Sequence, residues 1–209
     1  MKHSVQLTLV VLSAAVLPLC FPPFGWWPLV LLVFSPLLIA TTNTTPRRAF
    51  YLGMIHGIIG YGAALYWLFN IFAVAAIVLF VIIAAFTALF CLLLNYFAKQ
   101  TNSATLKLIL AATLWTALEF YRSELFFLRF PWITPGSALG PTYLSPIVGV
   151  YGTSFLVVAA SAGFVRRRTV PLAVFLSVCM LSLGLTRPGM VEPDKEGSIT
   201  VTVVQSEAS

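Results

Sequence analysis

The chain has 209 residues, of which 60% are hydrophobic and only 9% are charged. Soluble domains carry about a quarter charged residues, so this composition excludes a soluble fold, whose surface could not cover so much apolar area. The net charge of +6 is typical of nucleic-acid binding, but the basic residues lie in short segments between apolar runs. We therefore expect an integral membrane protein with no nucleic-acid partner.

Long apolar segments follow one another from the first residues onward. A helix needs roughly 20 apolar residues to cross about 30 Å of hydrocarbon. The second apolar segment, Pro28–Ala40, is too short to span unless the aromatic residues before it also enter the bilayer. We predict an all-α integral membrane protein with about seven transmembrane helices, over Val5–Cys20, Pro28–Ala40, Phe50–Phe69, Phe72–Phe97, Leu106–Tyr121, Ile147–Val165 and Val170–Leu185.

The basic residues between these segments predict the orientation. Cytoplasmic loops of membrane proteins are enriched in Lys and Arg. With a cytoplasmic N-terminus, all of these loop residues fall inside and every Asp and Glu falls outside: Lys2, Arg47, Arg48, Lys99, Lys107 and Arg166 to Arg168. We expect a multi-pass protein of this orientation, with the C-terminal tail outside the cytoplasm.

The end of the chain differs in composition from the rest. Residues 1–187 form the predicted membrane domain, and residues 188–209 begin with a polar linker rich in Pro, Gly and acidic residues. Ile199–Val204 then alternates apolar and Thr residues as a strand does. A single strand cannot bury itself, so we expect the start of an extracytoplasmic domain that stops after its first strand; a disordered tail is the alternative.

Charged residues gather where the fifth apolar segment ends. Glu119, Arg122, Glu124 and Arg129 lie within eleven residues, and the spacing of Trp115, Glu119 and Arg122 stacks these three on one helix face. An ionisable cluster at the edge of a membrane segment is a candidate functional site. The alternative is an interfacial ion pair that only ends the helix.

Within this cluster the charges suggest different roles. Glu119 can neutralise Arg122 one turn away, which predicts a structural ion pair and leaves Arg129 as the freer cation. Arg129 suits a lipid phosphate, and Phe130 and Trp132 suit acyl chains at a membrane interface. These three residues form the candidate lipid-binding site.

The sequence contains no pattern that supplies a reaction. It has no glycine-rich phosphate loop, no metal-ligand spacing and no Ser/His/Asp arrangement. Cys20, Cys91 and Cys179 lie in or beside apolar segments and read as small hydrophobic residues. His3 and His56 are isolated, and we expect a packing or polar contact for His56. We therefore predict no catalytic residue, no metal site and no cofactor.

Several short motifs occur in a specific order and spacing. They are Phe21-Pro22-Pro23-Phe24-x-x-Trp27-Pro28, Tyr66-Trp67, Trp115-x3-Glu119-Phe120-x-Arg122, Phe130-Pro131-Trp132, Leu144-Ser145-Pro146-Ile147-x-Gly149-Val150-Tyr151-Gly152-x-Ser154-Phe155-Leu156 and Ile199-x-Val201-x-x-Val204-Gln205. Together they resemble the bacterial apolipoprotein N-acyltransferases over nearly the whole chain. Ser123, Ser137 and Ser206 depart from residues that are common in that family.

The resemblance implies a function. In that family an α/β nitrilase-like domain on the outer face of the membrane domain supplies a Glu-Lys-Cys triad, which moves an acyl chain from a phospholipid to a diacylated lipoprotein. The resemblance therefore implies the bacterial plasma (inner) membrane, a phospholipid and a diacylated lipoprotein as partners, and a nitrilase-like domain truncated after its first strand. Because none of the triad is present, the chain is expected to be inactive alone.

A second function class fits the same residues. The chain would then be a non-enzymatic, lipid-binding membrane scaffold. It could equally anchor a separately encoded catalytic domain or enzyme, such as a polyprenyl-phosphate glycosyltransferase.

Overall fold

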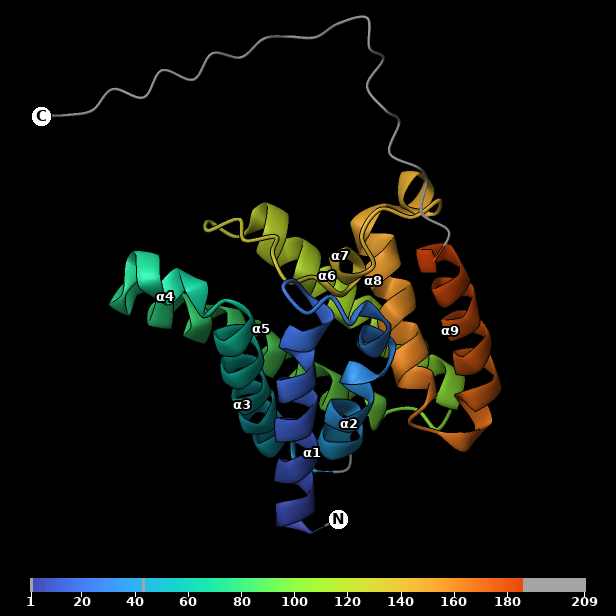
Figure 1. Cartoon of the computed structure of the whole chain (residues 1–209). Coiled ribbons are helices and arrows are strands. Elements are labelled where there is room, and N and C mark those ends of the chain that lie inside the picture. The colour runs from blue at the N-terminus through green and yellow to red at the C-terminus, as the bar shows by residue number, and fades with distance from the viewer. Residues whose placement is uncertain (1, 43, 186–209) are drawn as a thin grey trace, which may run out of the picture.

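The computed structural model describes residues 2–42 and 44–185. Every regular element in these ranges is a helix, which confirms the all-α prediction (Figure 1). The α-helices are α1 (His3–Val16), α2 (Val30–Thr42), α3 (Pro46–Ala64), α4 (Trp67–Phe72), α5 (Val74–Ala98), α6 (Ala104–Phe120), α7 (Pro135–Ala138), α8 (Ser145–Gly163) and α9 (Val170–Leu185). Shorter turns are the 3-10 helices Leu17–Cys20, Trp27–Leu29 and Arg167–Thr169 and the π-helix Tyr121–Leu125.

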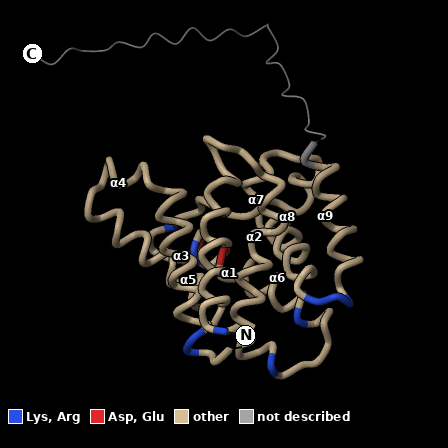
Figure 2. The backbone as a smooth tube through the Cα atoms, turned by 60° about the horizontal axis from the view of Figure 1, so that its bottom comes forward, with Lys and Arg blue, Asp and Glu red and all other residues tan. Residues whose placement is uncertain are grey.

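The long helices run alternately up and down, so the loops that join them lie at two opposite ends of the bundle (Figure 1). These two ends differ in their residues. Residues 2–3, 44–48, 99–107 and 164–169 form the end that we term the basic end. Most of the Lys and Arg residues that the structure describes lie there (Figure 2). Residues 65–73 and 121–145 form the opposite, aromatic end. Every basic loop used to predict the orientation is therefore on one side of the bundle.

Helices occupy all seven predicted apolar segments. Four helical stretches are long and apolar enough to cross a membrane by length and composition: His3–Cys20, Val74–Ala98, Ala104–Leu125 and Ser145–Gly163. Trp27–Thr42 is a shorter apolar helical stretch. The structure thus supports a membrane protein with at least four candidate spans, and the prediction of about seven spans is confirmed only in part.

The third predicted span, Phe50–Phe69, was placed too far along the chain. α3 begins earlier, at Pro46, because the side chain of Thr45 caps the helix by accepting a hydrogen bond from the Arg48 backbone N–H at 3.3 Å. α3 ends at Ala64, and the residues beyond it form the separate helix α4. A Thr-Pro helix start is visible in the sequence, whereas the apolar residues of α4 hide the break after α3.

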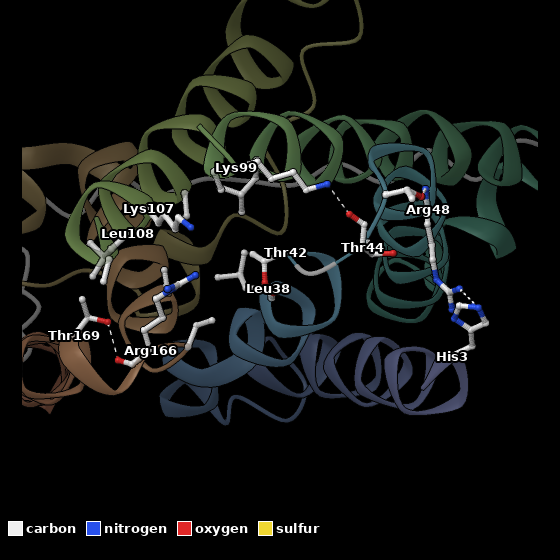
Figure 3. A pocket seen from close by; sticks show the side chains of 17 residues that line it. His3, Leu38, Thr42, Thr44, Arg48, Lys99, Lys107, Leu108, Arg166 and Thr169 are labelled. Atoms are coloured by element: carbon white, nitrogen blue, oxygen red, sulfur yellow. Dashed lines mark hydrogen bonds between the residues drawn. The ribbon is translucent and has the colours of Figure 1, made fainter. Parts of the chain in front are cut away.

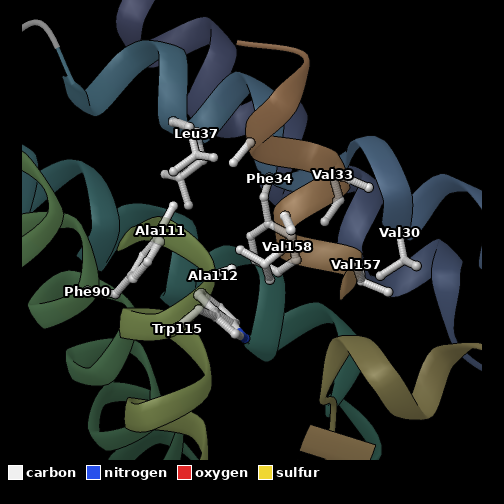
Figure 4. Packing of buried hydrophobic residues seen from close by; sticks show 14 of the residues in the cluster. Val30, Val33, Phe34, Leu37, Phe90, Ala111, Ala112, Trp115, Val157 and Val158 are labelled. Atoms are coloured by element: carbon white, nitrogen blue, oxygen red, sulfur yellow. The ribbon is translucent and has the colours of Figure 1, made fainter. Parts of the chain in front are cut away.

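Aromatic side chains from three helices meet in the centre of the bundle (Figure 4). The ring of Trp115 on α6 lies 4.4 Å from that of Phe34 on α2 and 5.0 Å from that of Phe90 on α5, both edge to face. Val157 and Val158 of α8 are fully buried in the same cluster. Edge-to-face pairs add roughly 0.5–1.5 kcal/mol each beyond their buried area. This packing fixes the end of α6 from which the charged residues project.

Small residues let α3 and α5 pack closely against each other. A Cβ atom on Gly53 would lie 2.8 Å from the Cα of Ala88, and one on Gly57 would lie 2.5 Å from the Cα of Ala84. Side chains larger than hydrogen would therefore push the two backbones apart. Gly53 and Gly57 therefore serve the packing of α3 against α5.

His56 lies on the same helix and is fully buried. Its Nε2 is 3.0 Å from the Ser13 hydroxyl, which donates in turn to the Val33 carbonyl at 2.5 Å. This polar contact links α1, α2 and α3, as expected for His56. The predicted strand Ile199–Val204 and the domain boundary at residue 187 lie outside the described residues.

Candidate functional site

The charged cluster lies where α6 passes into the π-helix at the aromatic end. The structure divides its four charged residues into two pairs. Glu119 and Arg122 are each only 4% exposed, whereas Glu124 and Arg129 are exposed. Buried ionic groups need polar partners, because an unpaired charge in an apolar interior is costly. The partners of the buried pair therefore define what the cluster does.

Glu119 joins three elements through hydrogen bonds. Its Oε2 accepts from the Trp115 indole N–H at 2.8 Å, and its Oε1 accepts from the Ser154 hydroxyl of α8 at 2.7 Å. The same hydroxyl accepts from the Gly136 backbone N–H of α7 at 2.9 Å. The contact to Trp115 confirms that the two residues share a helix face. Sequence reasoning gave no role to Ser154, although a serine inside an apolar helix is a signal for a buried polar contact.

Arg122 connects the loop after α6 to α3. Its Nη1 donates to the Tyr61 hydroxyl, and its Nη2 donates to the Trp132 carbonyl, both at 3.3 Å. The guanidinium carbon also lies 5.5 Å from the centre of the Tyr61 ring, within cation–π range. Tyr61, which is 2% exposed, was not anticipated, because nothing local in the sequence places it near residue 122.

Glu119 and Arg122 line the same small pocket, together with Tyr61 and Trp115. The hydrogen bonds described above join Glu119 to Trp115 and Ser154, and Arg122 to Tyr61 and Trp132. The predicted ion pair between Glu119 and Arg122 therefore stays a prediction. The structure adds that each of these side chains connects helices and loops distant in the sequence.

The three residues predicted to bind lipid all lie on the loop after the π-helix. The Trp132 ring lies 5.5 Å from the Phe130 ring and stacks on Trp67 of α4, with ring centres 5.2 Å apart. Arg129 is exposed, and its backbone is in the left-handed region with φ of 41°. Among the described residues no hydrogen bond reaches its guanidinium. Arg129 is therefore an exposed cation three residues before Trp132, which is one of the two stacked tryptophans.

Exposed aromatic residues surround this loop. Trp132 is 46% exposed, Trp67 42%, and Phe127 77%. Large apolar side chains exposed at one end of an apolar bundle are typical of contact with a membrane interface. A cation beside such a surface can bind a phosphate while the rings contact acyl chains.

In the part of the chain that the structure covers, no group of three His, Cys, Asp or Glu residues could hold a metal.

Glu124 is held apart from this surface. Its carboxylate accepts a hydrogen bond from the hydroxyl of Tyr151 on α8. The ring of Tyr151 packs edge to face against Phe120, with ring centres 5.3 Å apart. Glu124 thus links the π-helix to α8, and no carboxylate of the described residues pairs with Arg129.

Comparison with known proteins gives one consistent result. The family model for the apolipoprotein N-acyltransferase N-terminal domain matches residues 13–163. An apolipoprotein N-acyltransferase from Geobacter metallireducens is 30% identical over 194 residues, which is 84% of this chain and 37% of that protein. One from Coxiella burnetii is 31% identical over 71% of this chain and 33% of its own length. One from Nitrosomonas europaea is 26% identical over 88% of this chain and 41% of its own length.

The chain thus spans between a third and about two fifths of the length of these relatives. The matched region contains the central packing, the Glu119 network, the Arg122 contacts and the aromatic loop. On the family match over residues 13–163 and the similarity to the Geobacter protein, the chain belongs to the apolipoprotein N-acyltransferase family, and the matched part corresponds to its N-terminal domain.

Proposed function

We propose that this chain is the membrane domain of an apolipoprotein N-acyltransferase and binds the phospholipid from which the acyl chain is taken. The observation that carries the proposal is the exposed Arg129, which has no side-chain hydrogen bond among the described residues and lies three residues before Trp132 of the stacked pair Trp67 and Trp132. Phosphate and hydrocarbon are the two parts of a phospholipid, and this surface offers a partner to each. The reaction itself, transfer to the amine of a diacylated lipoprotein, is proposed from the family.

The buried residues support this surface from below. Arg122 donates a hydrogen bond to the Trp132 carbonyl and so positions both the loop and the indole ring. Glu119 accepts a hydrogen bond from the Ser154 hydroxyl, which in turn accepts one from the Gly136 backbone N–H of α7. Glu119 thereby positions α7, the short helix that follows the loop. Both residues act as positioning residues, and Arg129 and Trp132 make the contacts. A binding surface supported by buried hydrogen bonds loses less entropy when it binds its ligand.

The experiment that tests the function is a chimera. Residues 1–185 replace the matched part of the Geobacter metallireducens relative, whose remaining sequence is kept. In a bacterial strain depleted of its own acyltransferase, the chimera should restore triacylated lipoprotein, because the membrane domain presents the lipid to the rest of the enzyme. Mass spectrometry of a lipoprotein's N-terminal peptide measures the product.

The intact relative in the same strain is the positive control. A chimera that reaches the membrane in normal amounts but leaves the lipoprotein diacylated would contradict the proposed function. The non-enzymatic membrane scaffold would then be the better interpretation of the same surface.

We further propose that all seven apolar helical segments pass through the bacterial inner membrane, with the basic end in the cytoplasm. The alternating directions of the helices and the basic loops on one side support this topology. The aromatic end then faces outward, where the family's acyl transfer takes place.

Labelling of single cysteines tests the orientation. After Cys20, Cys91 and Cys179 are replaced by alanine, Ser137→Cys should react with a membrane-impermeant maleimide on intact cells. Arg167→Cys should react only after the cells are permeabilised, because its loop is cytoplasmic. Both positions are exposed in the structure, so burial does not explain a difference between them. Labelling of Arg167→Cys on intact cells would show that the orientation is reversed.

A further inference from the structure

A large cavity is present at the basic end of the bundle, opposite the aromatic end. A cavity of about 750 Å³ opens there between the ends of α2, α3, α5, α6 and α8 (Figure 3). Ligand-binding cavities in proteins typically measure about 300–1,000 Å³. The cavity shares no residue with the candidate site described above and is therefore a separate feature of the bundle.

Four cationic side chains line this cavity: Arg48, Lys99, Lys107 and Arg166. Two of them already have partners in the protein. Arg48 Nη1 is 2.9 Å from His3 Nε2, and the Lys99 ammonium donates to the Thr44 carbonyl at 2.7 Å. Arg48 and Lys99 therefore stabilise the rim of the cavity.

Lys107 and Arg166 are different. Within the described residues no hydrogen bond or carboxylate reaches either of these side chains, although their two positive charges act on each other. Figure 3 shows the ends of both side chains in the same part of the cavity. The acidic residues that the structure describes, Glu119 and Glu124, belong to the opposite end of the bundle. Two like charges that share a cavity without a counter-ion favour the binding of an anion.

Part of the cavity lining is apolar. Leu38, Leu94, Leu108, Ala111 and Val165 belong to it, and the first four of these side chains are buried. A small inorganic anion would satisfy Lys107 and Arg166 but would leave this apolar lining without contacts. An occupant that matches both parts has an anionic group joined to hydrocarbon. Basic pockets between membrane helices commonly bind the head groups of anionic lipids.

We propose that this cavity binds one anionic phospholipid, with its phosphate between Lys107 and Arg166 and its acyl chains along the apolar lining. The site requires membrane embedding of the bundle but not the acyl-transfer reaction. It is also independent of the aromatic surface at the other end. The lipid would connect α2, α5, α6 and α8 and hold the basic ends of these helices together.

The full chain in neutral detergent provides the test. Binding of dioleoyl phosphatidylglycerol is titrated by native mass spectrometry in about 0.15 M ammonium acetate, where charges more than about 8 Å apart are largely screened. All variants carry Arg129→Ala, which weakens the lipid site at the aromatic end equally in every sample. Lys107→Gln with Arg166→Gln should weaken binding about 100-fold, since each charge-assisted contact contributes about tenfold.

A matched double variant removes the same charge from the neighbouring positions. Arg167 and Arg168 line a neighbouring recess, which Arg166 also lines, but they do not line the cavity itself. Arg167→Gln with Arg168→Gln should therefore bind within about threefold of the parent, because screened charges outside the cavity contribute little. Melting curves of both double variants check that neither change unfolds the bundle.

Two further ligands separate the possible occupants. Dioleoyl phosphatidylcholine, with the same chains and no net charge, should bind much more weakly than phosphatidylglycerol. Glycerol 3-phosphate, with the phosphate and no chains, should compete only weakly. Equal losses in both double variants, equal binding of the two lipids, or glycerol 3-phosphate binding as tightly as the lipid would each overturn the proposal.

Discussion

Glu119→Ala is expected to lower the melting temperature of the chain in detergent more than any other single substitution in the charged cluster. The change removes the acceptor of two buried donors, the Trp115 indole N–H and the Ser154 hydroxyl. A buried donor left without a partner costs about 1–3 kcal/mol, so we expect a loss of about 3–5 kcal/mol of unfolding free energy. The cavity left by the side chain adds to this loss.

Two control substitutions make this result specific. Glu124→Ala removes an exposed carboxylate whose one hydrogen bond among the described residues comes from Tyr151, so it should cost less than about 1 kcal/mol. Glu119→Gln keeps an acceptor oxygen in place and should retain part of the stability. If Glu119→Ala melts like the parent, the network joining α6, α7 and α8 does not stabilise the fold.

The second prediction concerns lipid binding at the aromatic end. Arg129→Ala should weaken binding of dioleoyl phosphatidylethanolamine roughly ten- to a hundredfold, because a charge-assisted contact to the phosphate contributes about 1.5–3 kcal/mol. The melting temperature should stay unchanged, since the side chain is exposed and free of hydrogen bonds within the described residues. Native mass spectrometry of lipid retention, beside melting curves, measures both quantities.

Arg47→Ala is the matched control for this substitution. Arg47 is also an exposed arginine, but it lies at the basic end and outside the cavity there. It should leave retention of phosphatidylethanolamine unchanged. Retention of the lipid by Arg129→Ala, together with its loss in Glu119→Ala at unchanged stability, would mean that the two roles are assigned the wrong way round.

The sequence predicted the course of the chain better than the ends of its helices. Each long apolar run became a helix, because a run of that length has no other way to satisfy its backbone in a bilayer. The end of α3 was missed, since Trp67–Phe72 is as apolar as the helix before it and only its surroundings turn it into a separate element. Hydrophobicity alone therefore could not place that boundary.

For the site, local spacing was informative and distant contacts were not. The interval of four residues placed Trp115 against Glu119, since a helix fixes that geometry. Tyr61 and Ser154 lie 61 and 35 residues from their charged partners. Only the packing of α3 and α8 against α6 brings them near, so one sequence without structural information could not identify them.

The separation between Glu119 and Ser154 also constrains how the protein is made. Glu119 has one hydrogen-bond partner on its own helix and another on a helix that leaves the ribosome later. When α6 first enters the membrane, the Oε1 atom of Glu119 still lacks its partner on α8. A carboxylate in this state disfavours transfer of α6 by itself into lipid. We therefore expect α6 to reach its final place only when α8 lies beside it, so that the two helices enter the membrane as a pair.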